Sequence, residues 1–234
     1  MRRGRHRPRW YARLAGRGGD NAPIDAPWTH NRWELPDPES ADEHGIAGIG
    51  ADLEPSTVLA AYRRGLFPMR VHDLLAWWSP DPRGVIPPAG FHVSRSLRRS
   101  IRSFGITVDA AFAQVIRACA DARRPDGWID PSFVDAYTRL HALGFAHSVE
   151  VWLGDVLAGG LYGVRIARFF AGESMFHHVT DASKVACWAT TELLRIDGAT
   201  LFDVQWATPH LRTLGAVEVT RREYLRRLAR ALDG

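Results

Sequence analysis

The stretch "HSVEVWLGDVLAGGLYGVRIARFFAGESMF" (residues 147–176) decides the fold, because the period of the hydrophobic pattern changes there. The preceding segments have helical periodicity, whereas apolar residues within the stretch recur with a period near two, which is typical of β-strands. Gly154-Asp155 supplies a tight turn, and residues 165–168 span a second turn. The stretch therefore predicts two or three antiparallel strands.

Helices and further strands are expected on both sides of this stretch. Helical periodicity covers residues 94–105, 109–122 and 131–144 before it and 181–198 after it. The chain then continues with the strand "LFDVQW" (201–206), a helical turn, the strand "AVEVT" (216–220) and a helix over 221–232. This order predicts an α/β protein, with a mixed (α+β) sheet and helices on its faces.

The strand "LFDVQW" carries polar side chains on one of its two faces. Phe202, Val204 and Trp206 alternate as a buried face would. Side chains two residues apart on a strand point the same way, so Asp203 and Gln205 are expected side by side. Such a pair either lines a reaction site or bridges neighbouring loops.

Glu173 is a third polar candidate, because it ends a predicted strand between Gly172 and Ser174. An acid next to a glycine at a strand end is either a site residue or a simple turn residue. The strand over 201–206 is expected beside it after the crossover helix. Glu173, Asp203 and Gln205 are therefore expected to converge on one crevice, which is the candidate active site.

Composition and charge exclude several classes of protein. Hydrophobic residues make up 46% of the 234 residues and charged residues 24%, an ordinary globular balance. No apolar stretch is long enough to span a bilayer, and the basic N-terminus lacks the apolar region of a secretory signal. Cys119 and Cys187 are far apart and have no metal-ligand spacing, so a reduced, cytoplasmic protein without a metal site is expected.

The chain is expected to have three parts. Residues 1–40 are predicted to form a basic, disordered extension, residues 41–81 a small N-terminal domain and residues 82–234 the catalytic domain. The segment "WWSPDPRGVIPP" (77–88) is rich in proline, so we expect a rigid connector there rather than a helix or a central strand. The sequence contains no coiled-coil heptads, and a monomer is expected.

The helix over residues 94–105 has one strongly basic face. Its arginines follow the spacing i, i+3, i+4, i+7 and no acid lies within the helix: Arg95, Arg98, Arg99 and Arg102. A face that only contacts solvent usually mixes charges of both signs. A row of four arginines suits the phosphate backbone of a nucleic acid, so the helix predicts a polyanionic partner.

Several motifs, in this order and spacing, resemble the leucyl/phenylalanyl-tRNA–protein transferases. They are "GLFP", "WWSPDPR", "SRSLRR", "WI" at 128–129, "LHALGFAHSVEVW", "GGLYG", "GESMF", "ASK" and "DVQ" with "LGA" downstream. Each motif alone is weak, but their combination is very specific. The resemblance runs from about Gly45 to Leu232 and leaves out most of the first 40 residues.

The resemblance implies an activity and a fold. The family moves leucine or phenylalanine from its aminoacyl-tRNA to proteins whose N-terminal residue is Arg or Lys, and the product is marked for degradation. It uses neither a metal nor a coenzyme. A small N-terminal domain is followed by a domain like that of the GCN5-related N-acetyltransferases, which here corresponds to residues 82–234.

The resemblance also implies residue roles. The catalytic pair falls on Asp203 and Gln205, the pocket glutamate on Glu173, and a tryptophan near the terminal adenosine on Trp128. The tRNA-binding positions fall on the arginine row of residues 95–102. The expected remainder of the substrate site comprises Ser174, Met69, Leu161, Phe170 and Met175, with Phe202 a looser candidate.

Two positions depart from some members of the family. Met69 stands where some members have tryptophan, which removes an aromatic ring but leaves a soft side chain that packs against one. Leu161 stands where some members have methionine, a volume-conserving change that keeps a pocket apolar.

The residue types fit this chemistry. An aminoacyl ester is already activated, and its nucleophile is an α-amine with a pKa of about 7.7–8.0, partly neutral at working pH. Holding amine and ester together can supply about 7–11 kcal/mol of the barrier. Asp203 would accept a proton or fix the network, and Gln205, which cannot titrate, would orient a reacting group.

Two other functions remain open from the sequence. A coenzyme-A-dependent N-acyltransferase of the same fold would need a glycine-rich loop before the crossover helix, and "FHHVTDASK" (176–184) has no glycine. A tRNA-binding protein without catalysis would use the arginine helix but would not need Glu173, Asp203 and Gln205 together.

Overall fold

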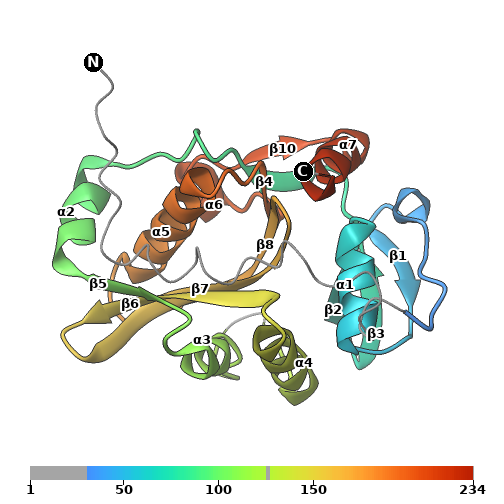
Figure 1. Ribbon diagram of the computed structural model, residues 1–234, viewed down its shortest axis with the longest axis horizontal. Helices are drawn as coiled ribbons and strands as arrows, with labels where there is room; N and C mark the ends of the chain where they lie inside the picture. Colours follow the sequence, from blue (N-terminus) through green and yellow to red (C-terminus); the bar gives the residue numbers. More distant parts are fainter. Residues whose placement is uncertain (1–30, 125–126, 234) are drawn as a thin grey trace.

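The computed structural model describes residues 31–124 and 127–233, which form two β-sheets with helices around them (Figure 1). Most of the expected basic extension, residues 1–30, lies outside the described residues. Residues 31–40 lead into the core, where Leu35 is buried. Among the described residues, no helix has the length and hydrophobicity that a membrane span requires.

The smaller sheet has three antiparallel strands in the order β1-β3-β2. Their bounds are β1 Ile46–Ile49, β2 Phe67–Val71 and β3 Leu74–Trp78. Helix α1 (Pro55–Arg63) connects β1 to β2 and ends before Gly65, whose positive φ of 88° suits the turn that follows the helix. This sheet lies at one end of the molecule, at the right of Figure 1.

The larger sheet has seven strands in the order β10-β4-β9-β8-β7-β6-β5. Their bounds are β4 Arg83–Ile86, β5 Gly105–Val108, β6 Ala146–Leu153, β7 Val156–Ile166, β8 Phe169–His177, β9 Leu201–Gln205 and β10 Val217–Val219. The three consecutive strands β6, β7 and β8 are antiparallel, as the period-two pattern over 147–176 predicted. Among the described strands only the β8–β9 pair is parallel, because a crossover helix joins those strands. The prediction of a mixed α/β fold is confirmed.

Helices cover both faces of the larger sheet (Figure 1). Their bounds are α2 Arg95–Ser103, α3 Phe112–Cys119, α4 Pro131–Ala142, α5 Ala182–Ile196, α6 Pro209–Thr213 and α7 Arg221–Leu232. Helices α3 and α4 pack on one face and α5 on the other, which creates two apolar clusters. The cluster beneath α3 and α4 also contains residues of α1, β2 and β3, so it joins the two sheets.

The expectation for the proline-rich segment over residues 77–88 was wrong. Residues 83–86 form β4, which lies between β10 and β9 in the larger sheet. The prolines flank this strand without entering it, so they do not remove donors from its hydrogen bonds. Gly84 also permits close packing, because a Cβ there would lie 2.5 Å from the backbone nitrogen of Ala207.

Candidate active site

Asp203 lies at the centre of β9 and is completely buried, as is Arg83 of β4, which faces it. Arg83 donates from Nε to Oδ1 at 2.9 Å and from Nη2 to Oδ2 at 2.7 Å, a bidentate ion pair. The hydroxyl of Tyr224 donates to Oδ2 at 2.8 Å, and the backbone N–H of Gln205 donates to Oδ1 at 2.9 Å. Four donors therefore occupy this carboxylate.

The surroundings of Arg83 stabilise its charged guanidinium. Burial alone would lower the pKa of the Arg83 guanidinium, but the neighbouring Asp203 carboxylate outweighs it and raises that pKa. The guanidinium also lies over the rings of Tyr224 and Phe67, at 4.3 and 4.8 Å from their centroids. A carboxylate held in this way has little capacity left for a substrate proton, so the geometry favours an anchoring part for Asp203.

Gln205 ends the regular alternation that we expected over residues 201–206. Its φ is 57°, in the left-handed region that residues other than glycine rarely adopt. The bond from its N–H to Asp203 Oδ1 holds this conformation. Its side-chain Nε2 lies 3.4 Å from Oε1 of Glu173, so the turn places the amide against a second carboxylate.

Glu173 lies on β8 where that strand and β9 separate. Their backbone pairing ends at Ala171 and Asp203, and beyond it the Glu173–Gln205 contact joins the two strands. The Tyr137 hydroxyl donates to Glu173 Oε2 at 2.9 Å, and the hydroxyls of Tyr137 and Tyr62 lie 2.6 Å apart. Desolvation by burial raises the pKa of the Glu173 carboxyl to about 7, although these hydroxyls oppose the shift. It can therefore exchange a proton near neutral pH.

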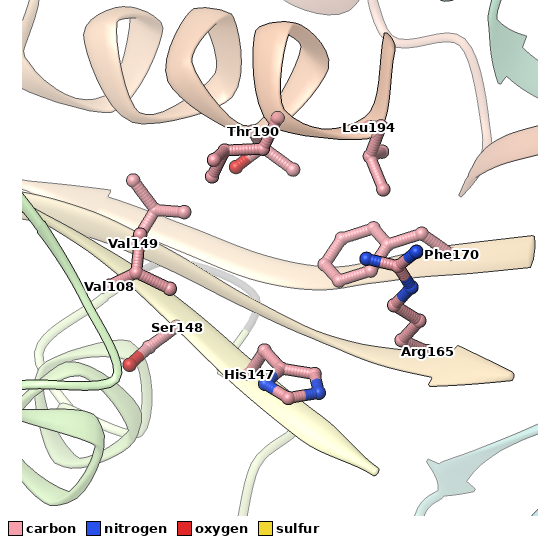
Figure 2. A pocket seen from close by; sticks show the side chains of 9 residues that line it. Val108, His147, Ser148, Val149, Arg165, Phe170, Thr190 and Leu194 are labelled. Carbon is pink, nitrogen blue, oxygen red and sulfur yellow. The ribbon is translucent and has the colours of Figure 1, made fainter. Parts of the chain in front are cut away.

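The apolar candidates gather on the opposite face of the sheet. Leu161, Phe170 and Phe202 belong to the cluster that packs against α5, and the partly buried Met175 packs against this cluster. The rings of Phe170 and Phe202 meet edge to face at 5.5 Å. Phe170 also borders a cavity of about 20 Å³, which has room for roughly one water molecule. Figure 2 shows Phe170 facing Thr190 and Leu194 of α5 across this space.

Of the three further candidates, Ser174 adjoins Glu173 on β8, whereas Trp128 and Met69 come from other segments. Ser174 Oγ accepts from Nη1 of Arg124 at 3.4 Å. Trp128 packs edge to face against Phe133 at 5.1 Å and lines a surface pocket of 340 Å³, which does not include Glu173, Asp203 or Gln205. Met69 lies on β2, where its backbone oxygen accepts from Trp78 Nε1 at 3.2 Å.

The four arginines of the basic helix are all exposed on α2. Ser94 caps this helix, because its Oγ accepts from the N–H of Leu97. The buried side chain of Leu97 and the 2.9 Å bond from Ser100 Oγ to Asp181 fix α2 to the body of the protein. Within residues 31–124 and 127–233, none of the four arginines forms an ion pair, so their charges face solvent unopposed.

Sequence reasoning missed Arg83 and the tyrosines Tyr62, Tyr137 and Tyr224. Arg83 stands between Pro82 and Gly84 in the segment that we interpreted as a connector. One signal was present: an aspartate on a strand with apolar residues on both sides requires a buried cation. The tyrosines come from distant helices, and no sequence spacing connects them. In the described part of the chain, no group of His, Cys, Asp and Glu side chains is arranged to hold a metal ion.

Comparison with known proteins identifies close relatives. The family model described as "Leucyl/phenylalanyl-tRNA protein transferase" matches residues 85–229, and the model for the N-terminal domain of that family matches residues 51–81. A leucyl/phenylalanyl-tRNA–protein transferase of Anaeromyxobacter sp. (strain K) is 50% identical over 205 residues, 85% of this chain and 88% of the relative. The protein of that name from Edwardsiella ictaluri is 47% identical over 83% of this chain and 82% of its own length.

Solved structures give weaker matches. A GCN5-related N-acetyltransferase from Kribbella flavida is 12% identical, with a TM-score of 0.39 over 71% of this chain and 61% of that one. The L-PGS structure from Bacillus licheniformis is 11% identical, with a TM-score of 0.37 over 53% of this chain and 46% of that one.

Proposed function

The chain belongs to the leucyl/phenylalanyl-tRNA protein transferase family, and we propose that it acts in the cytoplasm, as a monomer, on proteins that begin with Arg or Lys. It is an aminoacyltransferase that moves leucine or phenylalanine from aminoacyl-tRNA to a protein. The modified N-terminus marks the acceptor protein for degradation. The reaction requires neither a metal nor a coenzyme, because the ester that links the amino acid to the tRNA is already activated.

The observation that carries the site assignment is the contact between Glu173 and Gln205 where β8 and β9 separate. The acceptor amine attacks the ester carbonyl carbon, the new C–N bond forms, and the C–O bond to the ribose breaks. The amine loses a proton and the ribose hydroxyl gains one. Positioning of the two reactants accounts for the larger part of the acceleration.

Each polar residue has one part in this proposal. The Glu173 carboxylate holds the α-ammonium of the amino acid that is transferred. The Gln205 amide orients the ester carbonyl or the incoming amine. Asp203 is a positioning residue: with Arg83 and Tyr224 it fixes the left-handed backbone at Gln205.

The remaining candidates bind the rest of the donor. The amino acid reaches from Glu173 to the α5 face of the sheet through the opening where β8 and β9 separate, and the wall that receives its side chain comprises Leu161, Phe170, Met175 and Phe202. Ser174 borders this wall, and Trp128 and Met69 contact the terminal adenosine. The arginine row of α2 binds the tRNA backbone. Residues 41–81 are the small N-terminal domain, and residues 82–234 are the catalytic domain.

Transfer of labelled leucine from charged tRNA to a peptide that begins with arginine tests the proposal. We expect labelled leucine in this peptide and much less in a peptide that begins with aspartate. When labelled acetyl-coenzyme A is the only donor, we expect no label in either peptide. Binding of tRNA without transfer would leave only the tRNA-binding function. Acetylation of the peptide would favour the coenzyme-A-dependent enzyme.

A further inference from the structure

A third cavity, of about 540 Å³, lies between the C-terminal end of α3 and the last residues of β8. Its walls include Arg123 and Arg124 from one side and Met175, His177 and His178 from the other. Met175 also packs against the apolar cluster that contains Leu161, Phe170 and Phe202. The cavity therefore shares Met175 with the proposed aminoacyl site, and Met175 follows Glu173 by two positions on β8.

Arg124 gives this cavity a positive charge that no carboxylate of the described residues compensates. Its Nη1 donates to the Cys119 carbonyl at 2.9 Å and to Ser174 Oγ at 3.4 Å, and its Nη2 donates to the Met175 carbonyl at 2.9 Å. All three acceptors are neutral, and among the described residues no carboxylate pairs with this half-buried guanidinium. A cation fixed beside a cavity without a counter-ion favours an anionic ligand.

Among the described residues of the wall the one acid is Asp121, and a neighbouring arginine partly offsets its charge. Asp121 pairs with Arg123 at 2.6 Å, and this contact holds the pKa of the Asp121 carboxyl below its usual range. The Arg123 side chain is 88% exposed, so it can turn toward a ligand. His177 and His178 are both exposed and add hydrogen-bond donors. A cationic acceptor peptide is therefore disfavoured here, and a phosphate fits.

The cavity is also connected to the basic helix α2 through the start of α5. His177 and His178 precede the turn that leads into α5. At the start of α5, Lys184 Nζ lies 2.8 Å from Asp181 Oδ1. Asp181 in turn accepts from Ser100 of α2 at 2.9 Å. Direct contacts therefore join α2 to the start of α5. The cavity residues His177 and His178 come just before α5 in the chain, and Glu173 comes a few residues before them.

We propose that this cavity binds a backbone phosphate of the single-stranded 3′ end of the aminoacyl-tRNA, close to the aminoacyl group. The inference rests on the proposed function and adds a subsite to it. Arg124, held by main-chain oxygens, supplies the fixed charge. Arg123 and the two histidines complete the contacts to the phosphate oxygens.

Three leucyl donors test the subsite: leucyl-tRNA, a leucylated 3′-terminal trinucleotide that keeps its internucleotide phosphates, and leucyl-adenosine without any phosphate. Arg124→Gln should raise KM on the order of tenfold for the first two donors, the scale of a lost charge-assisted hydrogen bond, and leave kcat unchanged. KM for leucyl-adenosine should not change. The slope of log KM against log salt should fall by about 0.7, as for one single-strand phosphate contact.

Two further variants keep the test decisive if Arg124→Gln folds poorly. Asp121→Asn removes the competing carboxylate and should lower KM for both phosphate-bearing donors, whereas Arg123→Gln should raise it. Arg195→Gln is the matched control, because that arginine pairs with Glu192 on the far part of α5 and should affect none of the donors.

The outcomes separate the two hypotheses. Equal changes in KM for all three donors, or no change for the phosphate-bearing ones, would overturn the phosphate subsite. If inorganic phosphate competes with the donors although the variants leave KM for the tRNA and trinucleotide donors unchanged, that result would also overturn the subsite. Absence of transfer by the unaltered enzyme from every donor would overturn the proposed function instead.

Discussion

At the scale of single residues, the central finding is that Asp203 is paired before any substrate arrives. Its carboxylate shares two hydrogen bonds with Arg83, and neither side chain has meaningful exposure to solvent. A buried ion pair of this kind contributes little net stability, but breaking it leaves a charge without a partner. The pair therefore acts as a geometric constraint on β4, β9 and the turn at Gln205.

The first prediction concerns this constraint. Asp203→Asn should lower the free energy of unfolding by about 3–5 kcal/mol, because it leaves the Arg83 guanidinium buried without a counter-ion. Urea unfolding followed by circular dichroism measures this loss. Arg83→Met combined with Asp203→Leu should cost less than the sum of the single changes. A stable Asp203→Asn variant with kcat/KM reduced about 10²-fold would contradict the anchoring part and favour a chemical one.

The second prediction concerns Glu173. Its pKa is raised in the folded protein to about 7 from an ordinary value of 4.5, so folding favours the protonated form. That contribution to stability is fully present below about pH 4.5 and is lost as the pH rises through about 7. Glu173→Gln imitates the protonated form, so the variant should match the unaltered protein at pH 4.5 and exceed its stability at pH 8.

Urea unfolding of both proteins at several pH values checks the second prediction. The difference between the two curves isolates Glu173, because every other titrating group is common to both. A difference that does not depend on pH would show that the Glu173 carboxyl titrates at its ordinary value in the folded protein.

At the scale of elements, one face of α2 attaches the helix to the protein and another face carries its arginines. Leu97 is buried and attaches the helix, whereas the four arginines are exposed and form no ion pair with any described residue. The row is longer than one phosphate requires, and its spacing suits successive phosphates of an RNA backbone.

The third prediction follows from this arrangement. Changing Arg95, Arg98, Arg99 and Arg102 to Ala should raise KM for aminoacyl-tRNA and flatten its dependence on salt, by up to about 0.9 in slope for each duplex phosphate lost. The value of kcat at saturation should remain close to that of the unaltered enzyme. The Arg195→Gln variant serves again as the control, and an unchanged salt slope would reject α2 as the tRNA-binding element.

The fourth prediction belongs to strands β7, β8 and β9, whose apolar residues face α5. One methylene in a hydrophobic pocket separates substrates by only about 1–3 kcal/mol, so leucine and phenylalanine should both be transferred. Aspartate and serine should not be, because an apolar wall leaves their polar groups without partners. Single-turnover transfer from each charged tRNA is the measurement. Comparable rates for aspartate and leucine would exclude this wall as the side-chain site.

At the scale of the whole molecule, the two sheets share one apolar cluster. Val58 and Trp77 of the N-terminal part lie in the same cluster as Phe133 and Tyr162 of the remainder. The 2.6 Å contact between the Tyr62 and Tyr137 hydroxyls adds a polar connection between α1 and α4. These contacts join the proposed domains through a common core.

The fifth prediction is that the chain unfolds in a single cooperative transition. Calorimetric and van't Hoff enthalpies should agree, since neither part can lose its structure without exposing the shared cluster. Tyr62→Phe should reduce the midpoint of this one transition without splitting it. Two resolved transitions would contradict the common core.

Much of this architecture follows from local pattern. The period-two stretch over residues 147–176 predicted β6, β7 and β8, and the helical periodicity over residues 94–105 predicted α2, because these features depend on near neighbours in the chain. The strand β4 was missed, because its four residues stand between prolines and its pairing with β9 and β10 joins segments more than 100 residues apart.

The sequence by itself determined the mixed α/β class, the basic row on one helix and the motifs that identify the family, since these reside in residue types and short spacings. Only the tertiary structure decided that Asp203 faces Arg83, that Glu173 lies among two tyrosines and the Gln205 amide, and that Arg124 borders a cavity. The physical reason is that burial and charge pairing are properties of groups brought together from distant segments. A carboxylate in the sequence acquires its partners, its pKa and its part in the reaction only when the chain has folded around it.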